Sequence, residues 1–186
     1  MADLVDTVDA IRVFVDGLFN LPNNPPSLYI DIEGVNLLRH SSISILQLLD
    51  QAFSTAGASG QTSRDILESS SIPKVFFDIT TQTPSLAISA SIHLAGLHDL
   101  QLMELATRHF SRKQRTKCFN QRPLLPAIVR YCQQDVQFMP QLWLHYKAKL
   151  SPAWERKVEK ATRDRVALSQ TETFIGTGKH MVLRPW

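Results

Sequence analysis

The chain has 186 residues, 44% of them hydrophobic, and a formal net charge of +3. This length and composition are ordinary for a globular protein and predict one core-forming domain with a tail. The sequence has no run of about 18 apolar residues and no basic segment leading into an apolar N-terminal core, so we expect no membrane span and no signal peptide. Its two cysteines, Cys118 and Cys132, lack metal-ligand spacing and indicate reduced thiols in an intracellular protein, nuclear or cytoplasmic.

The N-terminal third predicts a helix followed by strands. Asp6 or Thr7 can cap a first helix with one apolar stripe, formed by Val8, Ile11, Val15 and Leu18. Residues 22–26 are proline-rich and form a linker into a strand at residues 28–33. We expect a second strand at residues 43–48 and then a flexible loop of small residues at 54–63.

Two acids close the first predicted strand. Because side chains alternate along a strand, Asp31 and Glu33 project from the same face. Two adjacent carboxylates repel each other in an apolar setting, and a divalent cation with a preference for oxygen ligands relieves that repulsion. The alternative is an ordinary strand end with solvated acids.

Predicted helices and strands alternate in the middle of the chain. A short helix is expected at residues 64–69 and a strand at residues 74–79. Asp99 precedes an apolar helical pattern, which is typical of a helix N-cap. The alternation indicates an α/β fold.

A long helical pattern runs over residues 126–150, with a bend expected at Pro140. Tyr131 and Asp135 are four residues apart and therefore share one face of this helix. A phenol one turn from a carboxylate can orient a water molecule that a metal ion activates. The alternative is a tyrosine at the edge of the core and an exposed aspartate.

These two pairs of residues resemble the motifs of the DEDDy 3′–5′ exonucleases, the ribonuclease D-like branch of the ribonuclease H-like superfamily. Asp31 and Glu33 match the Asp-x-Glu motif of the first strand, and Tyr131 and Asp135 match the Tyr-x-x-x-Asp motif of a late helix. The resemblance extends over roughly residues 5–150. Fungal members are the most similar, in the sequence of residues 26–34 and in the basic tail that ends in Trp186.

The resemblance implies a fold and a chemistry. The fold would be ribonuclease H-like, with a mixed central sheet flanked by helices over residues 1–150, and residues 151–186 would form a C-terminal helix and an irregular tail. Two Mg²⁺ or Mn²⁺ ions would be held by acids that include Asp31, Glu33 and Asp135, while Tyr131 orients the attacking water. Such a site hydrolyses phosphodiesters at single-stranded 3′ ends of RNA or DNA.

The sequence departs from the family at the second motif, where an acid is expected shortly after the strand. Pro84 stands at the position that we align with it. Asp78 lies earlier, and Asp99 is better explained as a cap. The alternatives are therefore a working or impaired exonuclease, an inactive pseudo-nuclease that binds nucleic acid or a protein, and an unrelated structural α/β domain.

A second departure concerns the edge of the sheet. Family members usually have another strand after the one at residues 43–48, whereas here the predicted loop follows directly. An abbreviated sheet leaves backbone donors and acceptors at its edge, which predicts self-association or poor solubility of the chain unless the loop at residues 54–63 covers that edge.

Basic residues are concentrated near the C-terminal half. A predicted loop carries Arg112, Lys113, Arg115 and Lys117, which we expect to bind phosphates of nucleic acid unless the loop is only a solvated surface. The last predicted helix, at residues 153–170, mixes both signs of charge, and its surface is expected to be self-paired.

Overall fold

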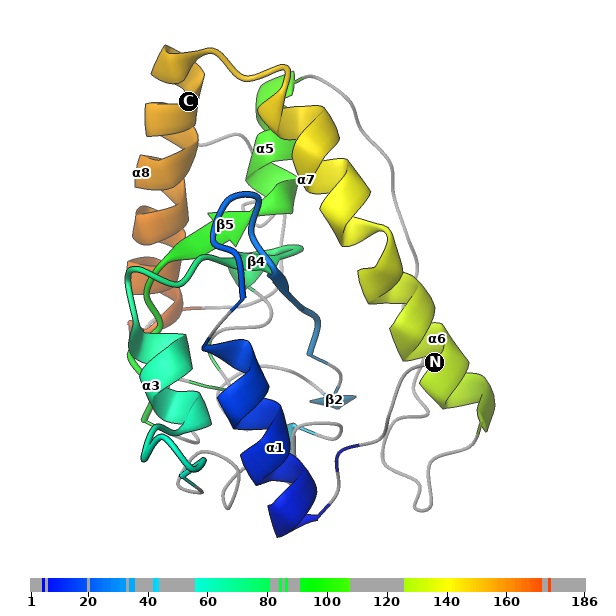
Figure 1. Cartoon of the computed structure of the whole chain (residues 1–186). Helices are drawn as coiled ribbons and strands as arrows, with labels where there is room; N and C mark the ends of the chain where they lie inside the picture. Colours follow the sequence, from blue (N-terminus) through cyan, green and yellow to red (C-terminus); the bar gives the residue numbers. More distant parts are fainter. Residues whose placement is uncertain are drawn as a thin grey trace.

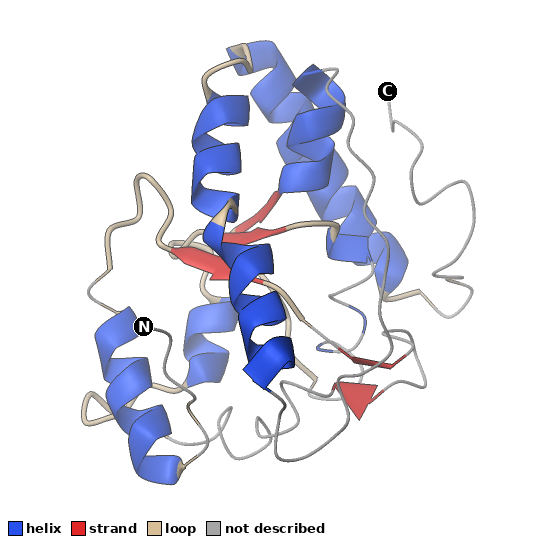
Figure 2. Ribbon diagram, turned by 90° about the vertical axis from the view of Figure 1, so that its right-hand side faces the viewer, coloured by secondary structure: helices blue, strands red, loops and turns tan. Residues whose placement is uncertain are grey.

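A parallel sheet lies at the centre of this computed structural model, which describes residues 5, 7–19, 21–32, 34–35, 42–43, 56–80, 84, 86, 91–107, 126–171 and 174. Its strands are β1 (Leu28–Ile30), β4 (Lys74–Phe76) and β5 (Leu97–Asp99), in the order β1-β4-β5. All pairs are parallel, and Phe76 lies opposite both Ile30 and Asp99. The strands lie in the interior and the helices around them (Figures 1 and 2).

The antiparallel part of the predicted mixed sheet forms a separate pair. Strand β2 (Gly34–Val35) pairs antiparallel with β3 (Ser42–Ile43) in a second, two-stranded sheet. β3 confirms the start of the predicted second strand. Residues 44–48, which would complete it, lie outside the described residues, so the edge-mediated self-association stays a prediction.

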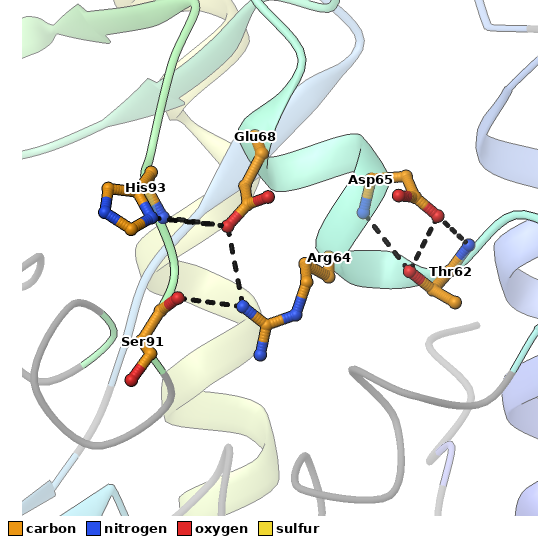
Figure 3. Close-up of polar contacts among 6 residues, drawn as sticks. All are labelled: Thr62, Arg64, Asp65, Glu68, Ser91 and His93. Carbon is orange, nitrogen blue, oxygen red and sulfur yellow. Dashed lines mark hydrogen bonds and ion pairs between the residues drawn. The ribbon is translucent and has the colours of Figure 1, made fainter.

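The two N-terminal helices begin at side-chain caps. Helix α1 (Val8–Leu18) is capped by Thr7, whose hydroxyl accepts from the backbone N of Ala10 at 3.2 Å, as the sequence predicts. Helix α3 (Ser63–Glu68) begins at Thr62 with a reciprocal capping box. In that box the backbone N of Thr62 donates to Asp65 and the backbone N of Asp65 donates to the Thr62 hydroxyl, at 2.7 and 3.3 Å (Figure 3).

The loop that was expected to be flexible is anchored in its described part. Asp16 of α1 accepts hydrogen bonds from the backbone N of Ala58 at 2.9 Å and of Ser59 at 3.3 Å. The bond from Ala58 is the main reason that the pKa of Asp16 lies below its usual value. The small residues of this loop therefore serve to bring backbone donors close to a carboxylate.

Helix α3 also holds the segment that leads into β5. Arg64 donates to the backbone O of Ser91 at 2.8 Å, and Glu68 accepts from the backbone N of His93 at 3.0 Å (Figure 3). A backbone bond from Ala95 to Leu67, 3.2 Å long, adds to these contacts. Together they fix the entry to β5 and thus the position of its carboxyl end.

The C-terminal half supplies four described helices: α5 (Leu100–Thr107), α6 (Pro126–Gln137), α7 (Met139–Lys147) and α8 (Pro152–Ser169). The single helix predicted at residues 126–150 is thus divided at Phe138, and Pro140 occupies the first turn of α7. A proline cannot donate the helical hydrogen bond of a helix interior, so this position confirms the predicted bend.

The sheet separates two layers of helices. On one face, Tyr29 and Val75 pack against α5, α7 and α8 in a cluster that includes Leu102, Leu105, Trp143, Val158 and Ala161. On the other face, Ile30 and Phe76 pack against Ile79, Leu86 and Ile92, while Leu28 joins the cluster of α1 and α3. Helix α8, although it belongs to the segment predicted as a C-terminal addition, shares the core of α5 and α7. No described helix has the length and apolar content needed to cross a membrane.

Candidate functional site at the carboxyl edge of the sheet

Three aspartates mark the carboxyl ends of the three parallel strands. Asp31 directly follows β1, Asp78 comes two residues after β4, and Asp99 is the last residue of β5. Because neighbouring parallel strands end at the same edge, these residues line one side of the sheet. In open α/β sheets this edge is the usual place for a ligand.

Asp31 is half-buried and follows a strand that ends earlier than the sequence suggests. The next residue, Ile32, is buried in the core, which fixes the chain as it leaves the sheet. Glu33 lies outside the described residues, so its predicted pairing with Asp31 stays a prediction.

Asp78 adopts an uncommon backbone conformation at this edge. Its φ is +64°, in the left-handed region, which aspartate and asparagine tolerate better than other side chains do. The hydroxyl of Thr80 donates to the Asp78 carboxylate. This turn carries the chain from the end of β4 directly into helical backbone at Ile79 and Thr80.

Asp99 is fully buried and serves two elements at once. Its Oδ1 accepts from the backbone N of Gln101 at 2.9 Å and of Leu102 at 3.3 Å, which confirms the predicted cap of α5. Its Oδ2 accepts from Arg165 of α8 at 2.9 Å. Burial raises the pKa of Asp99 and the nearby Asp78 charge adds to this effect, whereas Arg165 opposes it.

Arg165 was not among the residues predicted for the site, although the sequence contains a signal for it. The buried positions of α8 recur at helical spacing: Val158, Ala161, Thr162, Arg165 and Ser169. A charged residue on the stripe that faces the core requires a partner there. Helical periodicity alone could therefore have identified Arg165 as a buried cation.

Tyr131 and Asp135 lie one turn apart on α6, as predicted, and neither belongs to the buried core. Each takes part in a hydrogen bond, an ion pair, a ring contact or an electrostatic interaction. Within the described part of the chain, no three His, Cys, Asp or Glu side chains form a group that could hold a metal ion. Since Glu33 lies outside that part, the convergence of Asp31, Glu33 and Asp135 stays a prediction.

Two further expectations concern the second motif and the basic loop. Pro84 is buried and has helical backbone. A carboxylate introduced there would be removed from water. The predicted phosphate-binding residues, Arg112, Lys113, Arg115 and Lys117, all lie outside the described residues.

No known family profile matches the sequence, and no curated protein is significantly similar to it. Similarity is found to solved structures. Ribonuclease D of Trypanosoma brucei, solved in complex with RNA U12, superposes with a TM-score of 0.70 at 17% identity, over 97% of this chain and 77% of that one. A second crystal structure of the same enzyme gives a TM-score of 0.72 at 16% identity, over 95% and 75% of the two chains.

Two other solved structures have a similar architecture. The catalytic core of RRP6 from Trypanosoma brucei gives a TM-score of 0.67 at 17% identity, over 87% of this chain and 51% of that one. NrnC of Brucella melitensis gives a TM-score of 0.58 at 17% identity, over 84% of this chain and 96% of that one. At such low identity the likeness concerns the fold. The chain therefore has the ribonuclease H-like α/β fold of ribonuclease D, with a parallel sheet flanked by helices.

Proposed function

We propose that the chain is a 3′–5′ exonuclease-like domain that binds single-stranded ends of RNA or DNA at the carboxyl edge of its sheet. The observation that carries this proposal is the place of Asp31, directly after β1 at that edge, in a fold shared with ribonuclease D. Asp31 belongs to the first motif of the exonuclease resemblance, and Tyr131 and Asp135 provide the last motif on α6.

The acids suit divalent cations, since carboxylate oxygens are the ligands that Mg²⁺ and Mn²⁺ prefer. Asp31, Glu33 and Asp135 would hold the ions. Ions bound there would stabilise charge on the attacking and leaving oxygens in phosphodiester hydrolysis. Tyr131 would orient the nucleophilic water. Asp78 is the acid nearest in sequence to the position that we align with the second motif, and it lies at the same edge as Asp31.

A specific observation favours the alternative of a pseudo-nuclease. Pro84 stands where we align the second-motif acid, and a proline side chain has no oxygen with which to bind a cation. With fewer carboxylates, a second ion would bind weakly, and cleavage would slow by orders of magnitude because each loss of about 1.4 kcal/mol in transition-state stabilisation is tenfold. Binding of nucleic acid does not require that second ion.

The deciding experiment is digestion of 5′-labelled single-stranded RNA and DNA with Mg²⁺ or Mn²⁺. A ladder of products shortened from the 3′ end, absent with EDTA and in the Asp31→Ala variant, is the result expected of an exonuclease. Binding without a ladder identifies the pseudo-nuclease. Absence of both binding and cleavage would refute the proposed function.

A further inference from the structure

The outer face of α8 carries a stripe of cations. Arg156, Lys160 and Arg163 recur at positions i, i+4 and i+7, so they share one side of the helix, and all three are exposed. The buried residues of α8, among them Arg165, occupy the opposite side. The stripe spans about 10 Å along the helix, at roughly 1.5 Å per residue.

The stripe is less neutralised than the sequence suggests. Arg156 and Arg163 make no ion pair or hydrogen bond with the residues that the structure describes, and only Lys160 pairs within the helix, with Asp164 at 2.6 Å. Glu155 is drawn away to Lys147 of α7, at 2.8 Å. The prediction of a self-paired surface is therefore wrong for the two arginines. Glu159, on the flank of the stripe, is the nearest remaining acid of the helix.

The position of α8 relates the stripe to the candidate site. The helix runs along one side of the molecule (Figure 1), and its inner face contacts β5 through Arg165, which binds Asp99 at 2.9 Å. The stripe is thus the outer surface of the same helix whose inner surface supports the carboxyl edge of the sheet. A nucleic-acid strand that leaves that edge and passes over α8 would meet the stripe.

We propose that Arg156, Lys160 and Arg163 bind backbone phosphates of single-stranded nucleic acid whose end occupies the carboxyl edge of the sheet. This inference rests on the proposed function and extends it to a second contact surface. A convex, exposed row of cations without large apolar side chains suits a polyanion, whereas a protein partner would need buried apolar contacts. Arginine is also suited to phosphate because its planar guanidinium can donate two parallel hydrogen bonds. The contacts are to phosphates, so no sequence preference is expected.

The test is the salt dependence of binding, measured by fluorescence anisotropy with a 5′-labelled single-stranded U-rich RNA of about 20 nucleotides, in EDTA, between about 50 and 200 mM KCl. The variant is Arg156→Gln/Arg163→Gln. The matched control is Arg12→Gln/Lys157→Gln, which removes the same charge. Arg12 lies on α1, and Lys157 lies over the Trp154 ring on another side of α8. Each lost phosphate contact lowers the slope of log K against log[salt] by about 0.7 for single strands.

We expect the stripe variant to lose about 1.4 from the magnitude of the slope and to bind more weakly, while the control keeps the wild-type slope. Circular dichroism of both variants should match the wild type, since all four side chains are exposed. Glu159→Gln, on the flank of the stripe, should bind more tightly. Equal slopes in the two double variants would overturn the stripe proposal and leave the proposed function intact. If the wild-type protein binds no RNA, the stripe proposal and the proposed function are both refuted. If it binds RNA through the stripe but does not cleave it, only the proposed hydrolytic activity is refuted.

Discussion

Arg165 and Asp99 form a buried ion pair between α8 and the end of β5. The atoms Nη1 and Oδ2 are 2.9 Å apart, and the two side chains are 9% and 0% exposed. Arg165 also donates to Gln101 Oε1 at 2.8 Å, so one guanidinium fixes both the last residue of β5 and the first turn of α5. The carboxyl edge of the sheet is thus held in place by a residue that lies 66 positions later in the chain.

Removing one partner of this pair leaves an uncompensated charge in the core. We predict that Arg165→Met lowers the free energy of unfolding by about 3–5 kcal/mol at neutral pH. The double variant Arg165→Met/Asp99→Asn should recover part of the loss, because asparagine carries no charge and can still accept from the backbone of α5. Urea denaturation measures both values. Equal stability of the single variant and the wild type would show that the pair contributes nothing.

The same variant has a predictable pH dependence. The pKa of Asp99 is raised in the folded state, so folding favours its protonated form, and stability from this group falls as pH rises from about 4 through the folded pKa. Loss of Arg165 removes the main opposing influence and raises this pKa further. The destabilisation by Arg165→Met should therefore be smaller at about pH 5 than at about pH 7.5. A constant difference would mean that Asp99 does not titrate in this range.

Lys74 makes a second buried polar contact, beside α3. Its side chain is 0% exposed, and Nζ donates to the backbone O of Ile66 at 2.8 Å and of Ser69 at 2.6 Å. We predict that Lys74→Met lowers stability by about 1–3 kcal/mol, because carbonyls at the end of α3 lose their donor. Thermal and urea denaturation check this value. Arg12→Met on the exposed face of α1 is the control, with an expected change within about 0.5 kcal/mol.

Burial also lowers the pKa of Lys74 to about 8. Between this value and its ordinary pKa of 10.5, the unfolded chain binds a proton that the folded chain has released, so the contribution of this group to stability rises with pH. The neutral amine retains two N–H groups for its two carbonyl partners. The stability difference between wild type and Lys74→Met should accordingly grow from about pH 7.5 to about pH 9.5. A shrinking difference would mean that the ammonium form is the better donor.

Gly96 precedes β5 in a conformation that excludes side chains. Its φ is +65°, and a Cβ atom would lie 2.7 Å from the backbone O of Ile72 and 3.0 Å from that of Ser69. Gly96→Ala should destabilise the fold by about 2 kcal/mol or more, through positive φ and the clash together. Gly17 lies in α1, where an added Cβ atom would have nothing within 4 Å, so Gly17→Ala should stabilise by about 0.5–1 kcal/mol. Melting temperatures that shift in the same direction would contradict this contrast.

The local parts of the fold were predictable from sequence, and the tertiary parts were not. Thr7 and Asp99 precede apolar helical patterns, so their capping roles follow from neighbouring residues, and both are confirmed. The division at Phe138 follows from Pro140 in the same way. The anchoring of the small-residue loop by Asp16, in contrast, joins residues 42 positions apart, and no local pattern encodes it.

The candidate site shows the same division. That Asp31 follows a strand can be predicted from neighbouring residues. That Asp78 and Asp99 lie beside it depends on the strand order β1-β4-β5, which no local pattern encodes. Pro84 illustrates the limit of alignment by spacing. Its position was found by counting along the sequence from the predicted strand, and spacing alone does not indicate that the residue there is buried.

Asp78 offers a sharp test of the site because two substitutions distinguish the effect of its charge from the effect of its backbone conformation. Asparagine tolerates positive φ and can still accept from the Thr80 hydroxyl, so Asp78→Asn should change stability by less than about 0.5 kcal/mol. Asp78→Ala, in which that bond is lost and φ remains at +64°, should lower stability by about 1–2 kcal/mol.

If the Asp78 carboxylate serves the site in place of the missing second-motif acid, Asp78→Asn should weaken Mn²⁺ binding at least tenfold and reduce any metal-dependent trimming of 3′ ends by a similar factor or more. Calorimetric titration with Mn²⁺ measures the first effect even in a protein that does not cleave. Removal of the Asp78 charge also relieves the repulsion of Asp99, so the asparagine variant should keep its fold at neutral pH while it loses the metal. Suppose instead that Asp78→Asn keeps the wild-type Mn²⁺ affinity while Asp31→Ala loses it. The metal would then bind away from Asp78, and Asp78 would not replace the acid that is missing at Pro84.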